Sequence, residues 1–146
     1  MSDSINLPVI EAFLSELRPA GPWTLTAIYK KDDGPPDLPV VHSADFADIR
    51  AFCLLHATTN LYYQANETKP VTKKASAADL LNVSWVHVDI DHDDIGNRMT
   101  DPAQKAAMLS RLPAEHPHKT VKPRRPDLVI DSGNGVQALW PKISIC

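Results

Sequence analysis

The chain has 146 residues, of which 43% are hydrophobic, and a formal net charge of −3. This length suffices for one domain with a buried core, and the charge excludes a polycation, so any nucleic-acid surface has to be a local patch. Cys53 and Cys146 form neither a zinc-ligand spacing nor a disulfide framework, and the polar N-terminus is no signal peptide. No apolar run approaches the ~20 residues that span a membrane. We expect a single cytoplasmic domain, residues 1–146, without a membrane partner.

The first half of the chain combines helical and strand patterns. An apolar stripe at helical spacing follows Asn6, and the next segment is rich in β-branched and aromatic residues. His56 lies on the apolar stripe of a second helix, where a packed histidine is favoured over a ligand. The expected elements are a helix from Asn6 that ends before Gly21, a strand over 23–30, a loop or wide hairpin turn over 31–42, a helix of about sixteen residues capped by Ser43, and a strand over 60–66.

The strand over residues 60–66 has one polar but uncharged face, on which Tyr62 stands among amide side chains. Such a face is either a solvated sheet surface or a surface that contacts nucleotide or template through stacking and amide hydrogen bonds. The residues by themselves leave both interpretations open.

The second half predicts a short helix capped by Ser76, a strand over 85–91, a helix from Thr100 or Asp101 to Leu112, a short buried strand over 128–130, a turn over 131–135 and a returning strand over 136–140. The small residues of the helix give it a face that suits close packing on a sheet. Strands mixed with helices and a terminal hairpin predict an α/β or α+β sheet with helices on one face.

The strand over residues 85–91 alternates strictly, with valines and an isoleucine on one face and His87, Asp89 and Asp91 on the other. The two aspartates are about 6.6 Å apart along the strand, at about 3.3 Å per residue. Like charges at this spacing repel each other, and a cation between them relieves the repulsion. Mg²⁺ or Mn²⁺, which prefer hard oxygen ligands, suit the pair, and solvated surface carboxylates are the alternative.

The turn over residues 131–137 contains two glycines, which permit positive φ and a close approach of backbone amides to a ligand. It is either an ordinary glycine-rich hairpin turn or an anion-binding turn that holds a triphosphate. Two basic segments precede the two motifs in sequence, and they are either solvated surface or contacts to phosphates. Their charged residues are Lys69, Lys73, Lys74, Lys119, Lys122, Arg124 and Arg125.

Two motifs in combination are typical of one known family. They are the hydrophobic strand that ends in Asp-x-Asp, Val88–Asp91, and the Ser-Gly-x-Gly turn with its following strand, Ser132–Trp140. Residues 21–28, 60–66 and 74–91 fit the same pattern. On these features the chain resembles the RepB-like DNA primase domains of plasmids and phages, which belong to the archaeo-eukaryotic primase superfamily, over residues 6 to 140.

The resemblance implies an α+β fold with a mixed, mainly antiparallel sheet and helices packed on it, an RRM-like primase palm. It also implies template-directed primer synthesis from nucleoside triphosphates on single-stranded DNA, with a replicative helicase as a further partner. The implied catalytic and metal-binding residues are Asp89 and Asp91; the nucleotide-binding residues are Ser132, Gly133, Asn134, Gly135 and Gln137; the contacts to DNA or phosphate are Lys73, Lys74, Lys122, Arg124, Arg125 and Tyr62.

The sequence departs from the family pattern at two points. Gln137 stands where the wider superfamily often has a histidine that contacts phosphate, and glutamine donates hydrogen bonds without carrying charge. The family's third acidic motif lies on a strand beyond the hairpin, and the sequence ends at Cys146 before any such strand. We therefore expect the N-terminal portion of a primase domain, with one metal ligand fewer and impaired activity.

Two other classes of function stay open. A module that binds nucleotide or single-stranded DNA without chemistry would need the basic segments but not the aspartates. A metal-dependent phosphoesterase would draw on the ligand-type residues of the acidic strand and its end, and of the residues added to the aspartates only His87 shares their face. Its candidate residues are His87, Asp89, Asp91, His92 and Asp93.

Overall fold

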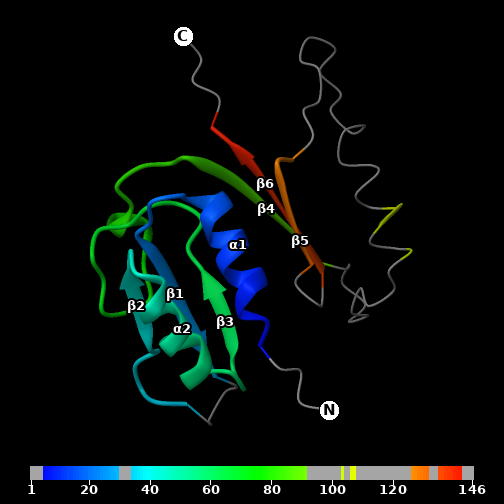
Figure 1. Cartoon of the computed structure of the whole chain (residues 1–146). Helices are drawn as coiled ribbons and strands as arrows, with labels where there is room; N and C mark the ends of the chain where they lie inside the picture. The colour runs from blue at the N-terminus through cyan, green and yellow to red at the C-terminus, as the bar shows by residue number, and fades with distance from the viewer. Residues whose placement is uncertain are drawn as a thin grey trace. The chain divides into compact units, whose positions relative to one another are not determined.

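The chain folds into two compact units, Met1–Ser84 and Trp85–Cys146, in a computed structural model (Figure 1). The structure describes residues 5–29, 34–91, 103, 106–107, 126–131 and 135–142, and of Ile90, Asp91 and Gly135 only the backbone. The elements are α1 (Leu7–Leu17), β1 (Trp23–Ile28), β2 (Val40–Ser43), α2 (Phe46–Leu55), β3 (Asn60–Tyr63), the 3₁₀-helix η1 (Ala77–Asp79), β4 (Trp85–Asp91), β5 (Leu128–Asp131) and β6 (Gly135–Pro141).

All strand pairs in the described residues are antiparallel, and the strands form two three-stranded sheets with the orders β2-β1-β3 and β4-β6-β5. The expected α+β class is therefore confirmed, with two small sheets in place of the single sheet anticipated. Each sheet is built around one central strand, β1 or β6, whose two neighbours run parallel to each other. A single catalytic domain that comprises both units stays a prediction.

The first unit begins with α1, whose start and end follow local rules. The Asn6 side chain accepts a hydrogen bond from Val9 N (3.3 Å), and Pro8 lies in the first turn, where its missing N–H costs nothing. The chain then turns into β1 through Gly21, whose φ of +63° lies in the left-handed region. A Cβ at this position would lie 3.0 Å from the Ala44 backbone, so the turn requires glycine.

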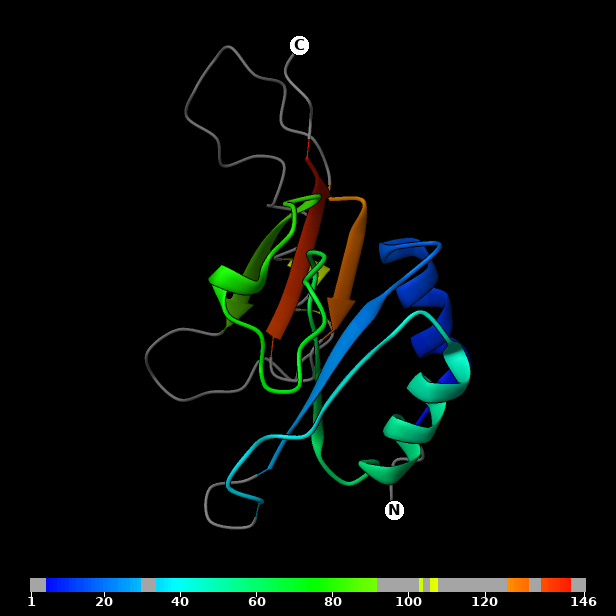
Figure 2. The same cartoon turned by 90° about the vertical axis from the view of Figure 1, so that its left-hand side faces the viewer.

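The core of this unit lies between β1 and the two helices, which lie side by side on one face of the sheet in both Figure 1 and Figure 2. Trp23, Leu25 and Ala27 point to this face and are buried. The Trp23 ring stacks on Phe46 of α2 (4.2 Å between centroids), and its indole N–H donates to the Leu14 carbonyl of α1 (2.8 Å). One aromatic side chain thus contacts both helices and fixes their position on the sheet.

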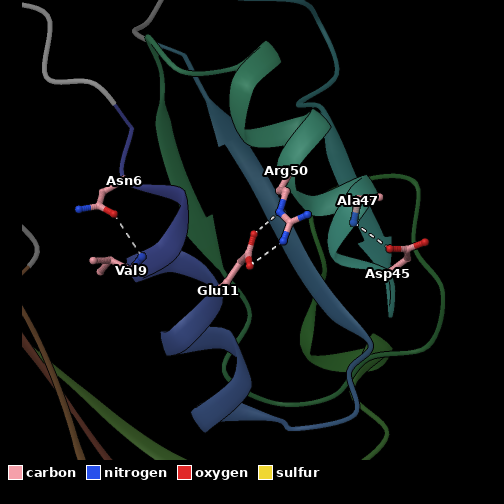
Figure 3. A network of polar contacts seen from close by, with 6 residues as sticks. All are labelled: Asn6, Val9, Glu11, Asp45, Ala47 and Arg50. Carbon is pink, nitrogen blue, oxygen red and sulfur yellow. Dashed lines mark hydrogen bonds and ion pairs between the residues drawn. The ribbon is translucent and has the colours of Figure 1, made fainter.

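An ion pair also links the two helices on their exposed side. The Arg50 guanidinium of α2 donates to both carboxylate oxygens of Glu11 on α1 (Figure 3). These hydrogen bonds lower the pKa of Glu11. Because the pair is exposed to solvent, it contributes little to the free energy of unfolding, and its effect is to orient α1 and α2 relative to each other.

The sequence-based element boundaries were wrong at β2 and α2. Residues 31–42 were expected to be a loop or a wide hairpin turn; β1 and β2 do pair as an antiparallel hairpin, but the segment ends earlier, since Val40–Ser43 form an edge strand with Val41 opposite Leu25. The helix that follows is capped by Asp45, which accepts from Ala47 N (2.8 Å), and has ten residues rather than about sixteen (Figure 3). Ser43 is the last residue of β2, so it cannot be the N-cap of the helix, and Asp45 takes this position. Pro39 obscured the strand, yet a proline is tolerated beside an edge strand, where its carbonyl accepts from Ala27 N (3.0 Å).

The second unit contains the sheet β4-β6-β5. Because β4 and β5 are both antiparallel to β6, they run parallel to each other with β6 between them. Parallel strands need a crossover connection, usually helical. Of the helix expected over residues 100–112, only Ala103, Ala106 and Ala107 are described; they are helical and exposed, so the close packing expected of these small residues is not seen for them.

Replacing Leu14 by alanine tests the helix–sheet core. Leu14 is 1% exposed, so we expect a loss of about 2–5 kcal/mol in the free energy of unfolding. Val9→Ala in the same helix is the matched control, because Val9 is 61% exposed, and its change stays within about 0.5 kcal/mol. Urea unfolding of the full chain followed by circular dichroism measures both; equal losses would contradict this packing.

Candidate functional site

The acidic strand β4 has the alternation expected from its sequence. Its partner β6 fixes which side chains share a face, since residues directly opposite each other in an antiparallel pair point the same way. His87 and Asp89 share one face and are exposed, whereas Val86 and Val88 lie on the other. The backbone of Asp91 continues the first face one pleat further along the strand.

The strand that leaves the glycine turn lies directly beside these aspartates. Gly135 pairs with Asp91, and Gln137 pairs with Asp89. The Gln137 amide nitrogen lies 3.4 Å from Asp89 Oδ2, a long hydrogen bond in which the amide donates. On the far side of Gln137 stands Ile130 of β5, so the polar face is bounded by an apolar residue. The acidic strand and the end of the turn are therefore neighbours in one sheet.

The residues at this face fit a divalent cation in their chemistry. Asp89 is exposed, and no cationic side chain in the described part of the chain pairs with its carboxylate. Gly135 has no side chain to fill the space opposite Asp91. Carboxylate oxygens are the ligands that Mg²⁺ and Mn²⁺ prefer. Among the described side chains there is no cluster of three or more histidine, cysteine or acidic residues that would form a complete site.

The opposite face of β4 is apolar. Val86 and Val88 of β4 and Val129 of β5 are 52%, 41% and 45% exposed, whereas Ala138 between them on β6 is fully buried. The two faces of β4 thus differ sharply in chemistry. On β4 itself the polar side chains, His87 and Asp89, lie on one face, whereas the opposite face of the sheet carries the Asp131 carboxylate of β5 beside these valines.

A closed loop carries the first basic segment in unit 1. Lys69 N donates to Asp79 O and Leu81 N donates to Glu67 O (both 2.9 Å), which closes the loop like a hairpin. At its base, Lys69 Nζ lies 3.1 Å from Asp79 Oδ1. Lys73 and Lys74 lie between the residues that close the loop, and both are exposed. The loop therefore presents two adjacent positive charges on an anchored backbone.

Asp79 anchors this loop by several hydrogen bonds. Its Oδ2 accepts from both the backbone N–H and the hydroxyl of Ser76 (2.8 Å each), which confirms the expected capped turn. The Ser76 backbone and side-chain hydrogen bonds, followed by that from Lys69, lower the pKa of Asp79 to about 2. The ionised carboxylate is thus the form that holds the loop closed.

The face of β1 that points away from the helices is polar and partly buried. The Thr24 hydroxyl lies 2.8 Å from His42 Nδ1 and 3.0 Å from the Thr68 hydroxyl, so the basic loop is attached to the sheet through Thr68. Tyr62 pairs with Thr26 on the same face and is 50% exposed. This Thr–His–Thr cluster was not foreseen; its signal was the Thr-x-Thr alternation in a strand otherwise apolar.

His56 was expected to be a packed histidine, and its surroundings confirm this. It is 7% exposed, its Nδ1 lies 2.9 Å from the Tyr29 hydroxyl, and its ring lies 4.5 Å from that of Phe52. It belongs to the core of unit 1 rather than to a site.

Several residues named from the sequence lie outside the described residues: Ser132, Gly133, Asn134, Lys122, Arg124, Arg125, His92 and Asp93. The structure accordingly brings together Asp89, Gln137 and the backbones of Asp91 and Gly135. Tyr62 and the two loop lysines belong to the other unit.

Comparison of the chain with profiles of known protein families, with curated proteins and with solved structures gave no match. No helix within the described residues is long and apolar enough to cross a membrane. The cytoplasmic location stays a prediction.

Lowering the pH tests the role of Asp79. Its folded pKa of about 2 is below the ordinary value of 3.8, so the ionised group stabilises the folded chain at pH values above the ordinary pKa, and this stabilisation is lost as the pH falls through 3.8 toward 2. Asp79→Asn should therefore be less stable than the wild type at pH 5, and the difference should vanish near pH 2. Urea unfolding at pH 5, 4, 3 and 2 measures it, and a constant difference would contradict the assignment.

Proposed function

We propose that the chain is a primase-type nucleotidyltransferase that extends a primer on single-stranded DNA, with the Asp89 face of β4 as its reaction site. The observation that supports this most is the β4–β6 register, in which Asp89 lies opposite Gln137 and Asp91 opposite Gly135. In this register the described part of the second motif, from Gly135 onward, lies beside the first motif, although the two are more than 40 residues apart in the sequence. An arbitrary pair of surface carboxylates would have no reason to meet a glycine turn.

The topology of the second unit also supports the proposal. Two parallel strands with an antiparallel strand between them are the split β-α-β arrangement. The order β4-β6-β5 has this form, and the three described residues of the connection are helical. An RRM-like palm contains such a unit.

In the proposed reaction, a primer 3′-hydroxyl attacks the α-phosphate of a nucleoside triphosphate in line with the departing pyrophosphate. Bound Mg²⁺ or Mn²⁺ supplies charge neutralisation of the attacking and leaving oxygens. Asp89 and Asp91 would hold the cations, since the two residues lie one pleat apart on the same face of β4. Ser132, Gly133 and Asn134, which precede Gly135 in the sequence, are the proposed contacts to the phosphates, and their backbone amides would donate to them.

The first unit would hold the template. Lys73 and Lys74 stand exposed on the loop anchored by Asp79, and Tyr62 stands exposed on the sheet face to which the loop is attached. Paired lysines bind phosphates, and a half-exposed tyrosine offers a ring for stacking of a base. Lys122, Arg124 and Arg125 are proposed as further phosphate contacts, and a replicative helicase as a further partner.

Substitution of Asp89 tests the proposal. The full chain is incubated with single-stranded DNA, labelled nucleotides and Mn²⁺, and products are resolved by size. We expect Asp89→Asn and Asp91→Asn each to lose at least about 100-fold in product, since loss of a metal ligand exceeds the 10- to 100-fold cost of losing an outer-sphere partner. Asp127→Asn removes an exposed carboxylate just before β5 and serves as the control. Equal synthesis by all variants, or none by the wild type, would refute catalysis.

The second candidate is a module that binds single-stranded DNA or nucleotide without chemistry. It is favoured by the position of Lys73, Lys74 and Tyr62 in a unit that folds around its own core without the aspartates. Such binding would depend on lysine charge and not on the carboxylates.

Salt dependence of DNA binding separates the two candidates. Fluorescence anisotropy of a labelled oligonucleotide is measured between 50 and 200 mM salt. If both lysines contact phosphates, Lys73→Ala/Lys74→Ala lowers the slope of log K against log salt by about 1.4, because each single-strand contact contributes about 0.7. Arg50→Ala, on the helix-covered side of the unit, is the control. Affinity unchanged by Asp89→Asn/Asp91→Asn, together with no synthesis, would identify a binding module.

A further inference from the structure

The side chain of Gln137 lies where a phosphate contact was expected from the sequence, yet its amide group is directed at a carboxylate. Gln137 is half-buried on the central strand, directly opposite Asp89, and its amide nitrogen is 3.4 Å from Asp89 Oδ2. Its neighbour on the other side is the apolar Ile130. Within the described residues, Asp89 has no other hydrogen-bond or ion-pair partner.

We propose that Gln137 is a positioning residue: it holds the Asp89 carboxylate in the rotamer that presents its other oxygen, Oδ1, to a divalent cation. This inference rests on the proposed function and gives Gln137 a role in place of the nucleotide contact first expected. The amide hydrogen bond to Oδ2 leaves Oδ1 free of protein partners in the described residues. A cation held at Oδ1 would meet a preorganised ligand rather than a freely rotating one.

The chemical nature of glutamine favours this role over alternatives at the same position. A lysine or arginine opposite Asp89 would form an ion pair and compete with a metal ion for the carboxylate. A histidine would carry charge in a pH-dependent manner. The glutamine amide is uncharged and does not titrate in the ordinary pH range, and it donates a hydrogen bond throughout that range. It thus orients Asp89 and leaves its negative charge available.

The cross-strand geometry explains why Gln137 can reach Asp89 at all. Side chains directly opposite each other in an antiparallel pair have Cβ atoms about 4.5–5.5 Å apart. Polar side chains at this separation are within hydrogen-bonding reach of each other, so the Gln137 amide can donate to Asp89.

The test measures Mn²⁺ binding to the full chain in the absence of nucleotide, by electron paramagnetic resonance of free Mn²⁺. Gln137→Met keeps the shape of the side chain and removes the donor. We expect its Mn²⁺ affinity to fall by about 10-fold or more, the range typical of lost outer-sphere partners, and Asp89→Asn to lose more. Gln137→Glu places a third carboxylate beside Asp89 and should bind Mn²⁺ more tightly than the wild type. Gln64→Met, a half-buried glutamine of the other unit, is the control and should not change binding.

The outcomes distinguish this inference from the proposed function. If Gln137→Met binds Mn²⁺ like the wild type but binds nucleotide more weakly, Gln137 contacts phosphate and the positioning role is overturned, while the metal site stands. If Asp89→Asn also binds Mn²⁺ like the wild type, the site itself is refuted and both proposals fall. If Gln137→Glu binds Mn²⁺ with the affinity of the wild type, residue 137 does not lie close to the cation, and the positioning role is overturned.

Discussion

The register between β4 and β6 is the constraint on which the candidate site depends. Side chains alternate along a strand with a period of two, so a slip of one residue would turn Asp89 and His87 to the opposite face and bring the valines in their place. Seven consecutive pairs, from Trp85 opposite Pro141 to Asp91 opposite Gly135, hold the strands in this register. The buried residues of this pair lie on β6, where Val136, Ala138 and Leu139 are 0–1% exposed, so a slip would disturb their packing. The same alternation that defines the strand therefore defines the site.

The two units share one sheet topology, although the faces of their sheets differ in chemistry. In each, a central strand separates two neighbours that run parallel to each other. In the first unit the central strand β1 carries Trp23, Leu25 and Ala27 toward two helices and Thr24 and Thr26 away from them, so one face makes a core and the other an internal polar network. In the second unit the central strand β6 supplies the buried Ala138 to the valine face of β4, and Gln137 and the buried Leu139 to the face of Asp89 and His87. A central strand determines what both faces of such a small sheet can do.

Local patterns predicted most elements, and non-local contacts account for what was missed. The bounds of β4 were predicted from the sequence because a strict alternation of polar and apolar residues over seven positions fits a half-buried strand and does not fit a helix, and Asn6 and Ser76 are caps with short-range partners. The strand β2 was missed because its four residues follow a proline, and only pairing with β1, some sixteen residues earlier, makes them a strand. Likewise the contact between Gln137 and Asp89 joins residues 48 positions apart. Sequence reasoning assigned Gln137 by its place in a motif, whereas its partner is set by the sheet.

Because residue 137 is neutral, the negative charge of the triphosphate has to be compensated by other groups in the proposed reaction. A histidine there could carry a positive charge toward a triphosphate, whereas the glutamine amide cannot. The Asp89 face remains net negative in the described residues, so an anionic nucleotide is repelled from it until a cation is bound. The dependence on divalent metal is then stronger than it would be with histidine, and the basic side chains become more important to affinity for phosphates. Lys73 and Lys74 carry their charges on a loop whose closure depends on ionised Asp79. In the proposed reaction, the charges that would hold a cation are thus different from those that would attract phosphates, and the uncharged Gln137 amide leaves the negative charge of Asp89 unpaired with a cationic side chain.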